Sequence, residues 1–299
     1  MANVHYGNIG DIWKHLPLAE ILAIESPSRY WESHAGSSHY ALTHSPERDY
    51  GIFYFAHAAS QSEILTHAVY TQLLKGYERN GLLRLAPGSP LLAMTVLQPH
   101  HATFVFCDID PQSLSTISDD HTRMGLAGDA VQLVQGDGIG TLNRLLVSSS
   151  FEEMSTTFAH LDPYLPLAAN AEGITSVDLF CEVSRRGGKA MLWYGFDSTG
   201  SQEQVHQQLH QHIQHTFQAH PFHPTAARLW WGEMTLKAIH TPDYPFNPGV
   251  MGCGIILSNA SLASVTACQH LGAALETLYA SAMLPHQQSG ALTFSEGPL

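Results

Sequence analysis

The chain has 299 residues, of which 44% are hydrophobic, enough to bury the core of one large α/β domain or of two smaller ones. Only 13 Lys and Arg oppose 26 Asp and Glu, giving a formal charge of -13. This balance argues against tight binding of nucleic acid, which relies on clustered cations. The longest apolar runs are far shorter than the roughly 20 residues of a membrane helix, so we expect no membrane association.

The amino terminus and the cysteines predict a cytoplasmic protein. The first residues contain neither the basic nor the apolar region of a secretory signal. The cysteines are widely spaced and form no Cys-x-x-Cys pair, so no disulfide framework and no zinc site are indicated. We expect Cys107, Cys181, Cys253 and Cys268 to be buried small residues.

Runs typical of strands alternate with runs typical of helices, which is the pattern of an α/β fold. The early strands are short and apolar, as buried parallel strands are. The predicted strands are 29–33, 103–107, 131–134, 156–161, 189–194, 234–239 and 254–258. A loop rich in Pro and Gly, 241–252, separates the last two, which could pair antiparallel through this long connection.

The segment between the first two strands is too long for a single crossover helix. Within 60–83, apolar residues recur at helical spacing: Ile64, Leu65, Val69, Leu73 and Leu74. We therefore expect a helical insertion subdomain at 43–87, with 1–42 and 88–299 forming the main domain. Because the insertion leaves from the carboxyl end of the first strand, it would lie beside a ligand crevice, as a lid or substrate wall or as a packing appendage.

Histidine is abundant, with 20 residues, and six of them fall within 206–223. His206 and His210 share one helical face at i, i+4, a spacing that can hold a metal ion. Their neighbours are mostly Gln, and neither an acid nor a Cys completes a ligand set. The segment predicts a solvated polar helix face, with a metal site as the alternative.

Polar residues follow each of the first four predicted strands. In open α/β sheets, ligands bind outside the carboxyl ends of the strands. There an acidic residue can accept hydrogen bonds from ribose hydroxyls. Small residues let a ligand approach the backbone, and a proline stiffens the loop after an acid. The four segments are Glu32-Ser33-His34-Ala35-Gly36, Asp108-Ile109-Asp110-Pro111, Gly136-Asp137-Gly138 and Asp162-Pro163-Tyr164.

The order of these segments resembles class I S-adenosylmethionine-dependent methyltransferases and, among them, the large-subunit (23S) ribosomal RNA adenine-N6 methyltransferase family. The resemblance spans nearly the whole chain, and the long insertion is also a family feature. The matching segments are His5-x-Gly7-Asn8-x-x-Asp11-x-x-Lys14-His15, Ser33-His34-Ala35-Gly36, Pro87-Gly88-Ser89-Pro90, Asp137-Gly138, Asp162-Pro163 and Leu192-Trp193-Tyr194. The resemblance implies a Rossmann-like class I methyltransferase sheet and S-adenosylmethionine as the cofactor.

The resemblance also implies roles for individual residues. Asp162 would be catalytic and accept a hydrogen bond from the attacking amine, while Asn8 and Lys14 would order the amino-terminal segment. Tyr164, Trp193 and Tyr194 would lie on the substrate side. The cofactor contacts would be His15, His34, Ser89, Asp108 (where the family has Glu), Asp137 and Gly138.

Each of these assignments has a simpler structural alternative. Taken singly, His15 and His34 could be core histidines. Asp11 and Lys14 could form an ordinary i, i+3 helix pair. Trp193 and Tyr194 could equally be core residues or residues that stack on the substrate.

The substrate side departs from the family. The family motif Asp-Pro-Pro-aromatic grips a flipped base, but here Pro163 is followed directly by Tyr164, one place early. The substrate-facing Tyr near the family's amino terminus has no counterpart. Together with the charge of -13, these departures predict methylation of a small-molecule amine or other metabolite.

Two other functions stay open. The first is the family activity on ribosomal RNA, with the insertion and the cluster Arg185, Arg186 and Lys189 holding phosphates. The second is a non-enzymatic cofactor-binding protein that serves as an interaction module.

Overall fold

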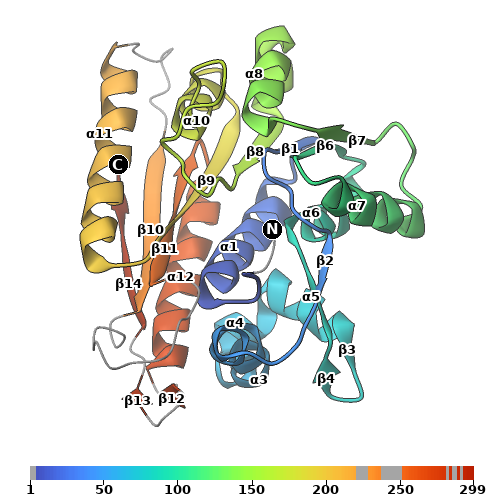
Figure 1. Cartoon of the computed structure of the whole chain (residues 1–299), viewed down its shortest axis with the longest axis vertical. Coiled ribbons are helices and arrows are strands. Elements are labelled where there is room, and N and C mark those ends of the chain that lie inside the picture. The colour runs from blue at the N-terminus through green and yellow to red at the C-terminus, as the bar shows by residue number, and fades with distance from the viewer. Residues whose placement is uncertain (1–4, 220–227, 237–250, 281–282, 285–287, 290–291) are drawn as a thin grey trace.

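The computed structural model describes residues 5–219, 228–236, 251–280, 283–284, 288–289 and 292–299. Its centre is an 8-stranded sheet in the order β14-β10-β11-β9-β8-β1-β6-β7 (Figure 1). The strands are β1 (Arg29–Glu32), β6 (Thr103–Asp108), β7 (Val131–Gln135), β8 (Thr157–Leu161), β9 (Lys189–Phe196), β10 (Leu229–Leu236), β11 (Gly252–Ser258) and β14 (Leu292–Pro298).

The strands β9, β8, β1, β6 and β7 run parallel, whereas β11 is antiparallel to both of its neighbours, β9 and β10. This arrangement is the Rossmann-like class I methyltransferase sheet that the sequence predicts. The antiparallel pairing of β10 with β11 is confirmed. The order reverses between β1 and β8, and such a switch point is where an open α/β sheet forms its ligand crevice.

The observed strands differ from the predicted ones in two respects. The strand predicted at 234–239 is β10, which begins earlier, at Leu229, and residues 237–239 lie outside the described part of the chain. The edge strand β14 was not predicted, because its Ser, Glu and Gly residues lack strand propensity. Its pairing with β10 stabilises it instead, an interaction between segments that are distant in sequence.

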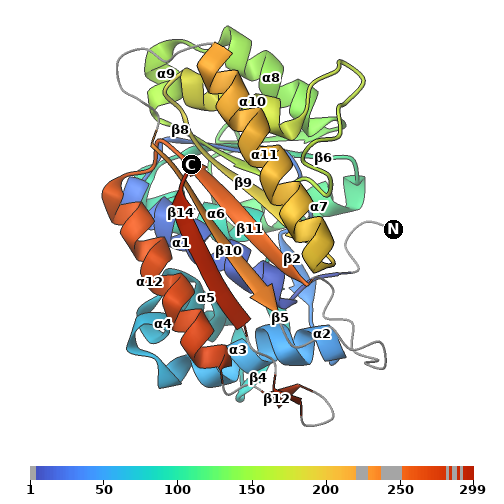
Figure 2. The same ribbon diagram turned by 90° about the vertical axis from the view of Figure 1, so that its left-hand side faces the viewer.

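Helices cover both faces of the sheet, and Figure 2 shows α12 and α11 on opposite sides of it. One face packs against α1, α6, α7 and α12, and the other against α8, α9, α10 and α11. The helices are α1 (Ile9–Glu25), α6 (Ser89–Leu97), α7 (Pro111–Met124), α8 (Gly138–Ser148), α9 (Phe151–Ser155), α10 (Ser176–Arg185), α11 (Thr199–Ala219) and α12 (Leu262–Tyr279).

The first helix, α1, crosses the core and brings its amino terminus to the carboxyl edge of the sheet. It is enclosed on nearly every side, and Trp13 donates a hydrogen bond from Nε1 to the carbonyl of Gly232 at 3.1 Å. Asn8 is its N-cap and accepts a hydrogen bond from the backbone N–H of Asp11. The cap fixes where the helix starts and so directs the residues of its first turns.

The segment between β1 and α6 contains short helices and strands. Antiparallel pairing of β2 with β5 closes its base. The run predicted as helical, 60–83, contains α4 and α5, which a non-helical ψ of 137° at Ala68 separates, followed by the β3–β4 hairpin. The elements are β2 (His39–Ala41), α2 (Pro46–Arg48), a π-helical turn (Asp49–Phe53), α3 (Tyr54–Ala58), α4 (Glu63–His67), α5 (Val69–Tyr77), β3 (Glu78–Arg79), β4 (Leu82–Leu83) and β5 (Leu85–Pro87).

This segment shares one continuous core with α1 and α12. The hydroxyl of Tyr54 donates to the carbonyl of Leu278 at 3.0 Å, and the hydroxyl of Tyr279 donates to the carbonyl of Gly51 at 3.2 Å. A short hairpin, β12 (Met283–Leu284) with β13 (Gln288–Ser289), follows α12. The 39–87 segment is therefore packed firmly against the helices that flank the carboxyl edge of the sheet.

Candidate active site

A cavity of about 810 Å³ opens at the carboxyl ends of the parallel strands, at the switch point between β1 and β8. The loops after β1, β6, β7 and β8 all contribute to its wall, as do the start of α1 and the start of α6. Among the predicted site residues, the following line it: Asn8, Lys14, His15, His34, Ser89, Asp108, Asp137, Gly138, Asp162, Tyr164 and Trp193. Residues separated by up to 185 positions in the chain thus face one cavity, because parallel strands end at a common edge.

The loop after β1 is held by the carboxylate that ends β6. Asp108 accepts hydrogen bonds from the backbone N–H of Gly36 at 2.7 Å and of Asp110 at 2.8 Å. Gly36 has a φ of 62°, a conformation that other residues adopt at a cost. The backbone therefore fixes the Asp108 carboxylate at the cavity wall, where it can still accept hydrogen bonds from the hydroxyl groups of a ligand.

The start of α8 packs directly against the same loop. Asp137 caps the helix by accepting the N–H of Ile139 at 3.0 Å, and the side-chain amide of Asn170 donates to its second oxygen at 2.7 Å. At Gly138, a Cβ atom would lie 1.9 Å from the carbonyl oxygen of Ser33. Only glycine allows this approach, which brings the loops after β1 and β7 into contact.

The Pro-Gly-Ser-Pro segment leads into α6 on the other side of the cavity. Gly88 is the N-cap of this helix, and no side chain caps it. A Cβ at Gly88 would lie 2.2 Å from the carbonyl oxygen of Ser37, so this position is also confined to glycine. The free backbone N–H groups at the start of a helix are suited to a carboxylate or phosphate, and Ser89 lies at this point.

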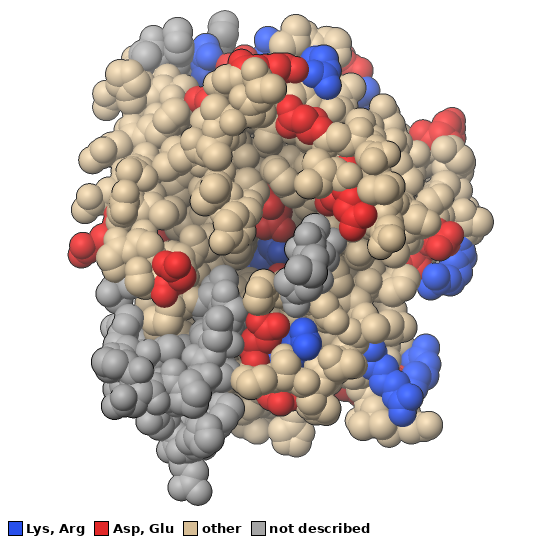
Figure 3. Space-filling model, viewed as in Figure 1, with Lys and Arg blue, Asp and Glu red and all other residues tan. Residues whose placement is uncertain are grey.

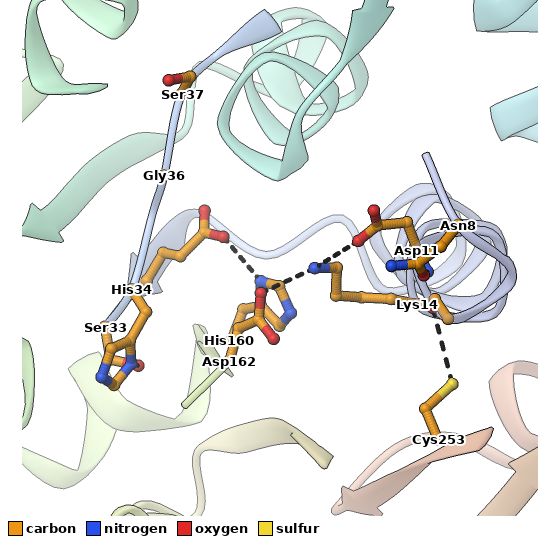
Figure 4. A network of polar contacts seen from close by, with 12 residues as sticks. Asn8, Asp11, Lys14, Ser33, His34, Gly36, Ser37, His160, Asp162 and Cys253 are labelled. Carbon is orange, nitrogen blue, oxygen red and sulfur yellow. Dashed lines mark hydrogen bonds and ion pairs between the residues drawn. The ribbon is translucent and has the colours of Figure 1, made fainter. Parts of the chain in front are cut away.

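Across the cavity, an ion-pair network joins α1 to the end of β8 (Figure 4). Lys14 Nζ lies 2.8 Å from Asp162 Oδ2 and 3.0 Å from Asp11 Oδ1. Asp11 also accepts the backbone N–H of Gly7 at 2.7 Å. The network thus ties the amino-terminal segment to the Asp162 carboxylate, and Pro163 ends the strand immediately after it.

The electrostatics of this network keep Asp162 ionised. Burial alone would raise its pKa, but the Lys14 ammonium group, with His160 as a smaller contributor, outweighs burial and lowers the pKa of Asp162 below its usual value. Burial likewise opposes the charge of Lys14, but the carboxylates of Asp162 and Asp11 raise the Lys14 pKa well above its usual value. Asp162 is consequently a hydrogen-bond acceptor and a weak base.

The two predicted cofactor histidines differ in their surroundings. His15 is 6% exposed, and its Nδ1 has no hydrogen-bond partner among the described residues. Burial, aided by Lys14, lowers the pKa of His15 to about 3, so the ring is neutral at physiological pH. His34 is exposed in the cavity and its Nδ1 lies 2.8 Å from Ser33 Oγ. Both rings can offer a neutral nitrogen to a ligand.

Of the aromatic residues assigned to the substrate side, Tyr194 does not reach the cavity. Trp193 does, with Lys14 Nζ 5.4 Å from its ring centroid, and Tyr164 is 90% exposed at the rim. Successive side chains of a strand point to opposite faces, so Tyr194 is buried on the other side of the sheet. There its hydroxyl donates to Glu233 Oε1 at 2.5 Å.

The sequence reasoning missed several residues that line the cavity. Tyr6 stacks on Tyr40 with ring centroids 4.8 Å apart, and the Arg48 guanidinium lies 4.8 Å from the Tyr6 ring centroid. Asp11, which belongs to the amino-terminal motif but was given no role at the site, and Tyr70 also face the cavity. Tyr6 and Asp11 stand within the amino-terminal motif itself, which was the available signal, whereas Tyr40 and Tyr70 come from the 39–87 segment.

The helix face of His206 and His210 is only partly solvated, whereas the sequence predicted a solvated face. His206 Nδ1 lies 2.7 Å from Oε1 of the buried Glu233, and the two imidazole centroids are 3.7 Å apart, both beside Trp231. Glu233 comes from β10, too distant in sequence to be recognised as a partner. The described residues contain no group of three His, Cys, Asp or Glu side chains arranged to hold a metal ion, and His220 and His223 lie outside them.

This histidine pair predicts a loss of stability in acid. Burial, followed by the nearby His206, lowers the pKa of His210 to about 4. The unfolded chain therefore binds this proton more readily, and stability falls as the pH drops from about 6.5 towards 4. The free energy of unfolding should fall between pH 7 and pH 5 in both proteins, but the fall should be about 1 kcal/mol smaller in His210→Gln than in wild type. Urea denaturation at both pH values measures this; the exposed His215→Gln is the control, and equal losses in both variants would contradict the assignment.

Comparison with known proteins supports the fold over the whole chain. Protein LPL1258 from Legionella pneumophila str. Philadelphia 1 has a TM-score of 0.71 at 19% sequence identity, and the alignment covers 98% of each chain. An S-adenosylmethionine-dependent methyltransferase from Agrobacterium tumefaciens matches at a TM-score of 0.42 and 12% identity, over 86% of this chain and 64% of its own. Cofactor-bound Rv0187 from MTB matches at a TM-score of 0.38 and 11% identity, and the alignment covers 83% of this chain and 80% of its own.

The likeness to LPL1258 shows a shared fold, whereas the other two are too distant to support an argument. No family model and no curated protein matches the sequence. None of the helices in the described ranges is long and apolar enough to span a membrane. The strand order and the position of the cavity define a Rossmann-like class I methyltransferase fold.

Proposed function

We propose that this protein is an S-adenosylmethionine-dependent methyltransferase that N-methylates a small-molecule amine. The observation that carries the proposal is the meeting, in one cavity, of the loops after β1, β6 and β7 with the Asp162 carboxylate at the end of β8. The loops after β1, β6 and β7 would contact the cofactor. Asp162 also lines the cavity, paired with Lys14, where an acceptor amine would be oriented.

The residues of the cavity fit this cofactor. The confined glycines Gly88 and Gly138 bring the loops of the cavity wall into close contact, and the unpartnered Nδ1 of His15 is available to a ligand. Asp108 would accept the ribose hydroxyls. The uncapped start of α6, at Ser89, would bind the carboxylate of the cofactor's methionine part.

S-adenosylmethionine supplies a methyl group on a positively charged sulfur, which the amine nitrogen attacks in line. Asp162 would accept a hydrogen bond from the amine N–H and hold the nitrogen lone pair towards the methyl group. Because Lys14 lowers the pKa of Asp162, this carboxylate orients an uncharged amine better than it deprotonates an ammonium ion. We therefore expect an acceptor whose amine is neutral at the working pH.

The charges around the cavity favour a small acceptor over RNA. Asp11, Asp108, Asp137 and Asp162 line it, and the ammonium group of Lys14 is already engaged by two of them. Figure 3 shows acidic side chains around the hollow on this face. Such a surface repels phosphates.

The basic cluster considered for RNA lies elsewhere. Arg185 and Arg186 pair with Glu182 on α10, and Lys189 Nζ lies 3.6 Å from a carboxylate oxygen of Glu25. Lys189 begins β9, at the amino-terminal edge of the sheet, opposite the cavity. The cluster therefore offers no phosphate contact beside Asp162.

The proposal is tested by methyl transfer from labelled S-adenosylmethionine in a cell extract, with products separated by size into RNA, protein and small molecules. We expect label in the small-molecule fraction. Label in RNA would instead support adenine-N6 methylation. Absence of label from every fraction, together with cofactor binding by the purified protein, would support the interaction-module reading.

Salt dependence provides a second prediction. Methylation of a small acceptor should change less than about threefold between about 50 and 200 mM salt, because few counterions are released on binding. An RNA substrate with several phosphate contacts should lose affinity by about 10³-fold or more over the same range. Initial rates at subsaturating acceptor, measured at both salt concentrations, distinguish the two; a steep fall would contradict the small-molecule proposal.

A further inference from the structure

Three polar side chains form a buried network beneath Asp162. Glu32 and His160 are 0% exposed, as is Tyr30. His160 Nδ1 lies 2.9 Å from Glu32 Oε1, and the Tyr30 hydroxyl donates to Glu32 Oε2 at 3.1 Å. The same hydroxyl lies 3.2 Å from His160 Nδ1, so each member contacts the other two.

The network lies within an aromatic part of the core. The centroids of the Phe104, Phe106 and Phe158 rings lie 6.3, 5.8 and 6.2 Å from that of Tyr30. In such surroundings the desolvation of a buried charged pair can exceed its mutual attraction, and well-packed apolar residues are often at least as stabilising. Stability alone is therefore a poor explanation for a Glu and a His at these positions.

The position of the network relates it to the site. Glu32 is the last residue of β1, immediately before the loop that begins at Ser33, and His160 stands two residues before Asp162 on β8. Glu32 and His160 are register partners, and the Ser33 N–H donates to the His160 carbonyl at 3.2 Å. Figure 4 shows His160 close behind Asp162. The pair thus joins the loop on the cofactor side to the strand end that carries the carboxylate.

One atom of the network has no partner. His160 Nε2 is enclosed, and no described residue forms a hydrogen bond with it. Buried polar atoms are nearly always paired, so an unpaired nitrogen next to a candidate active site suggests a functional constraint on the residue.

We propose that Glu32 and His160 are positioning residues. Glu32 fixes the His160 ring through the 2.9 Å contact at Nδ1, and His160, two residues before Asp162, in turn fixes the end of β8 and with it the position of the Asp162 carboxylate. The inference rests on the proposed methyl-transfer function, in which Asp162 orients the acceptor amine. A buried Glu side chain requires hydrogen-bond partners, and the His160 ring and the Tyr30 hydroxyl provide them.

Several charged or titratable groups face Asp162 besides His160. Lys14 is the largest source of the lowered Asp162 pKa, His160 follows it, and His34 contributes from the loop after β1. Asp11 acts on the same network through its ion pair with Lys14. Removal of His160 should therefore weaken the ionisation of Asp162 without abolishing it.

The experiment compares His160→Leu with a variant in which the whole network is apolar, Tyr30→Phe/Glu32→Leu/His160→Leu. The second variant leaves no unpaired buried partner and is expected to fold. Phe158→Leu, on the same strand and sheet face, is the control for a packing change without loss of charge. All three are examined as full-length protein by carboxyl-labelled Asp NMR, in which the Asp162 signal is the one lost in Asp162→Asn.

We expect the Asp162 carboxyl to titrate about one pH unit higher in both network variants than in wild type or Phe158→Leu. Turnover should fall by about tenfold or more in the network variants, with the KM for S-adenosylmethionine changed by less than about threefold. An unchanged Asp162 titration in folded His160→Leu, or an equal loss of turnover in Phe158→Leu, would overturn the proposal. If wild type transfers no methyl group, the proposed function fails, and the titration alone still decides whether the pair acts on Asp162.

Discussion

Asp162→Asn is expected to lose methyl transfer almost completely while retaining cofactor binding. The amide has the size of the carboxylate, but it lacks the negative charge that orients the acceptor N–H and stabilises the positive charge that develops on the nitrogen. Positioned groups of this kind contribute about 10²- to 10⁴-fold, so we expect turnover to fall by about 10²-fold or more. Lys14 keeps its ion pair with Asp11, so the helix beside the cofactor side should stay in place.

Two measurements on the same preparation test this prediction. Calorimetric titration gives the affinity for S-adenosylmethionine, which should change less than about threefold, and labelled transfer gives turnover. Asp119→Asn, an exposed carboxylate on α7 far from the cavity in the fold, is the matched control and should behave as wild type. A large drop in cofactor affinity would show instead that Asp162 contacts the cofactor, and its assignment to the acceptor side would then be wrong.

Gly138→Ala should disrupt the junction between α8 and the loop after β1. The new Cβ would lie 1.9 Å from the carbonyl oxygen of Ser33 and within 3 Å of its carbonyl carbon and Cα. All three are backbone atoms, so no side-chain rotation relieves the overlap and the two segments must separate. We expect the free energy of unfolding to fall by about 3 kcal/mol and cofactor affinity to fall by at least about tenfold.

Gly76→Ala is the matched control, because a Cβ at this position in α5 meets nothing within 4 Å. It should leave cofactor affinity unchanged and raise helix stability slightly, since Ala has a higher helix propensity than Gly. Denaturant unfolding and calorimetric titration measure both effects. Full cofactor affinity in Gly138→Ala would mean that the contact between these two loops does not shape the cofactor site.

Much of the cavity wall could be predicted from the sequence. The short apolar strands and the polar residues after them, such as Asp108 and Asp137, are local patterns. Because parallel strands end at one edge of a sheet, local patterns suffice to bring these residues together once the strands are recognised. The confinement of Gly88 and Gly138 is not a local feature, because it comes from the backbone of Ser37 and Ser33 in the loop after β1.

The other parts of the site could not be predicted, because they depend on contacts between segments that are distant in sequence. Glu32 and His160, or His206 and Glu233, become partners only through strand register and helix packing, which single-segment patterns do not encode. The pairing of Lys14 with Asp162 is of the same kind, although both residues stood in recognised motifs.

The sequence by itself determined the α/β class, the first parallel strands and the loops that line the cavity, because these follow from local alternation and strand-end chemistry. Only the tertiary structure decided that Trp193 faces the cavity while Tyr194 lies behind the sheet, since adjacent strand residues differ only in the face they occupy. It also placed Lys189 at the edge opposite the cavity, because strand direction, and not sequence proximity, determines which edge a residue occupies.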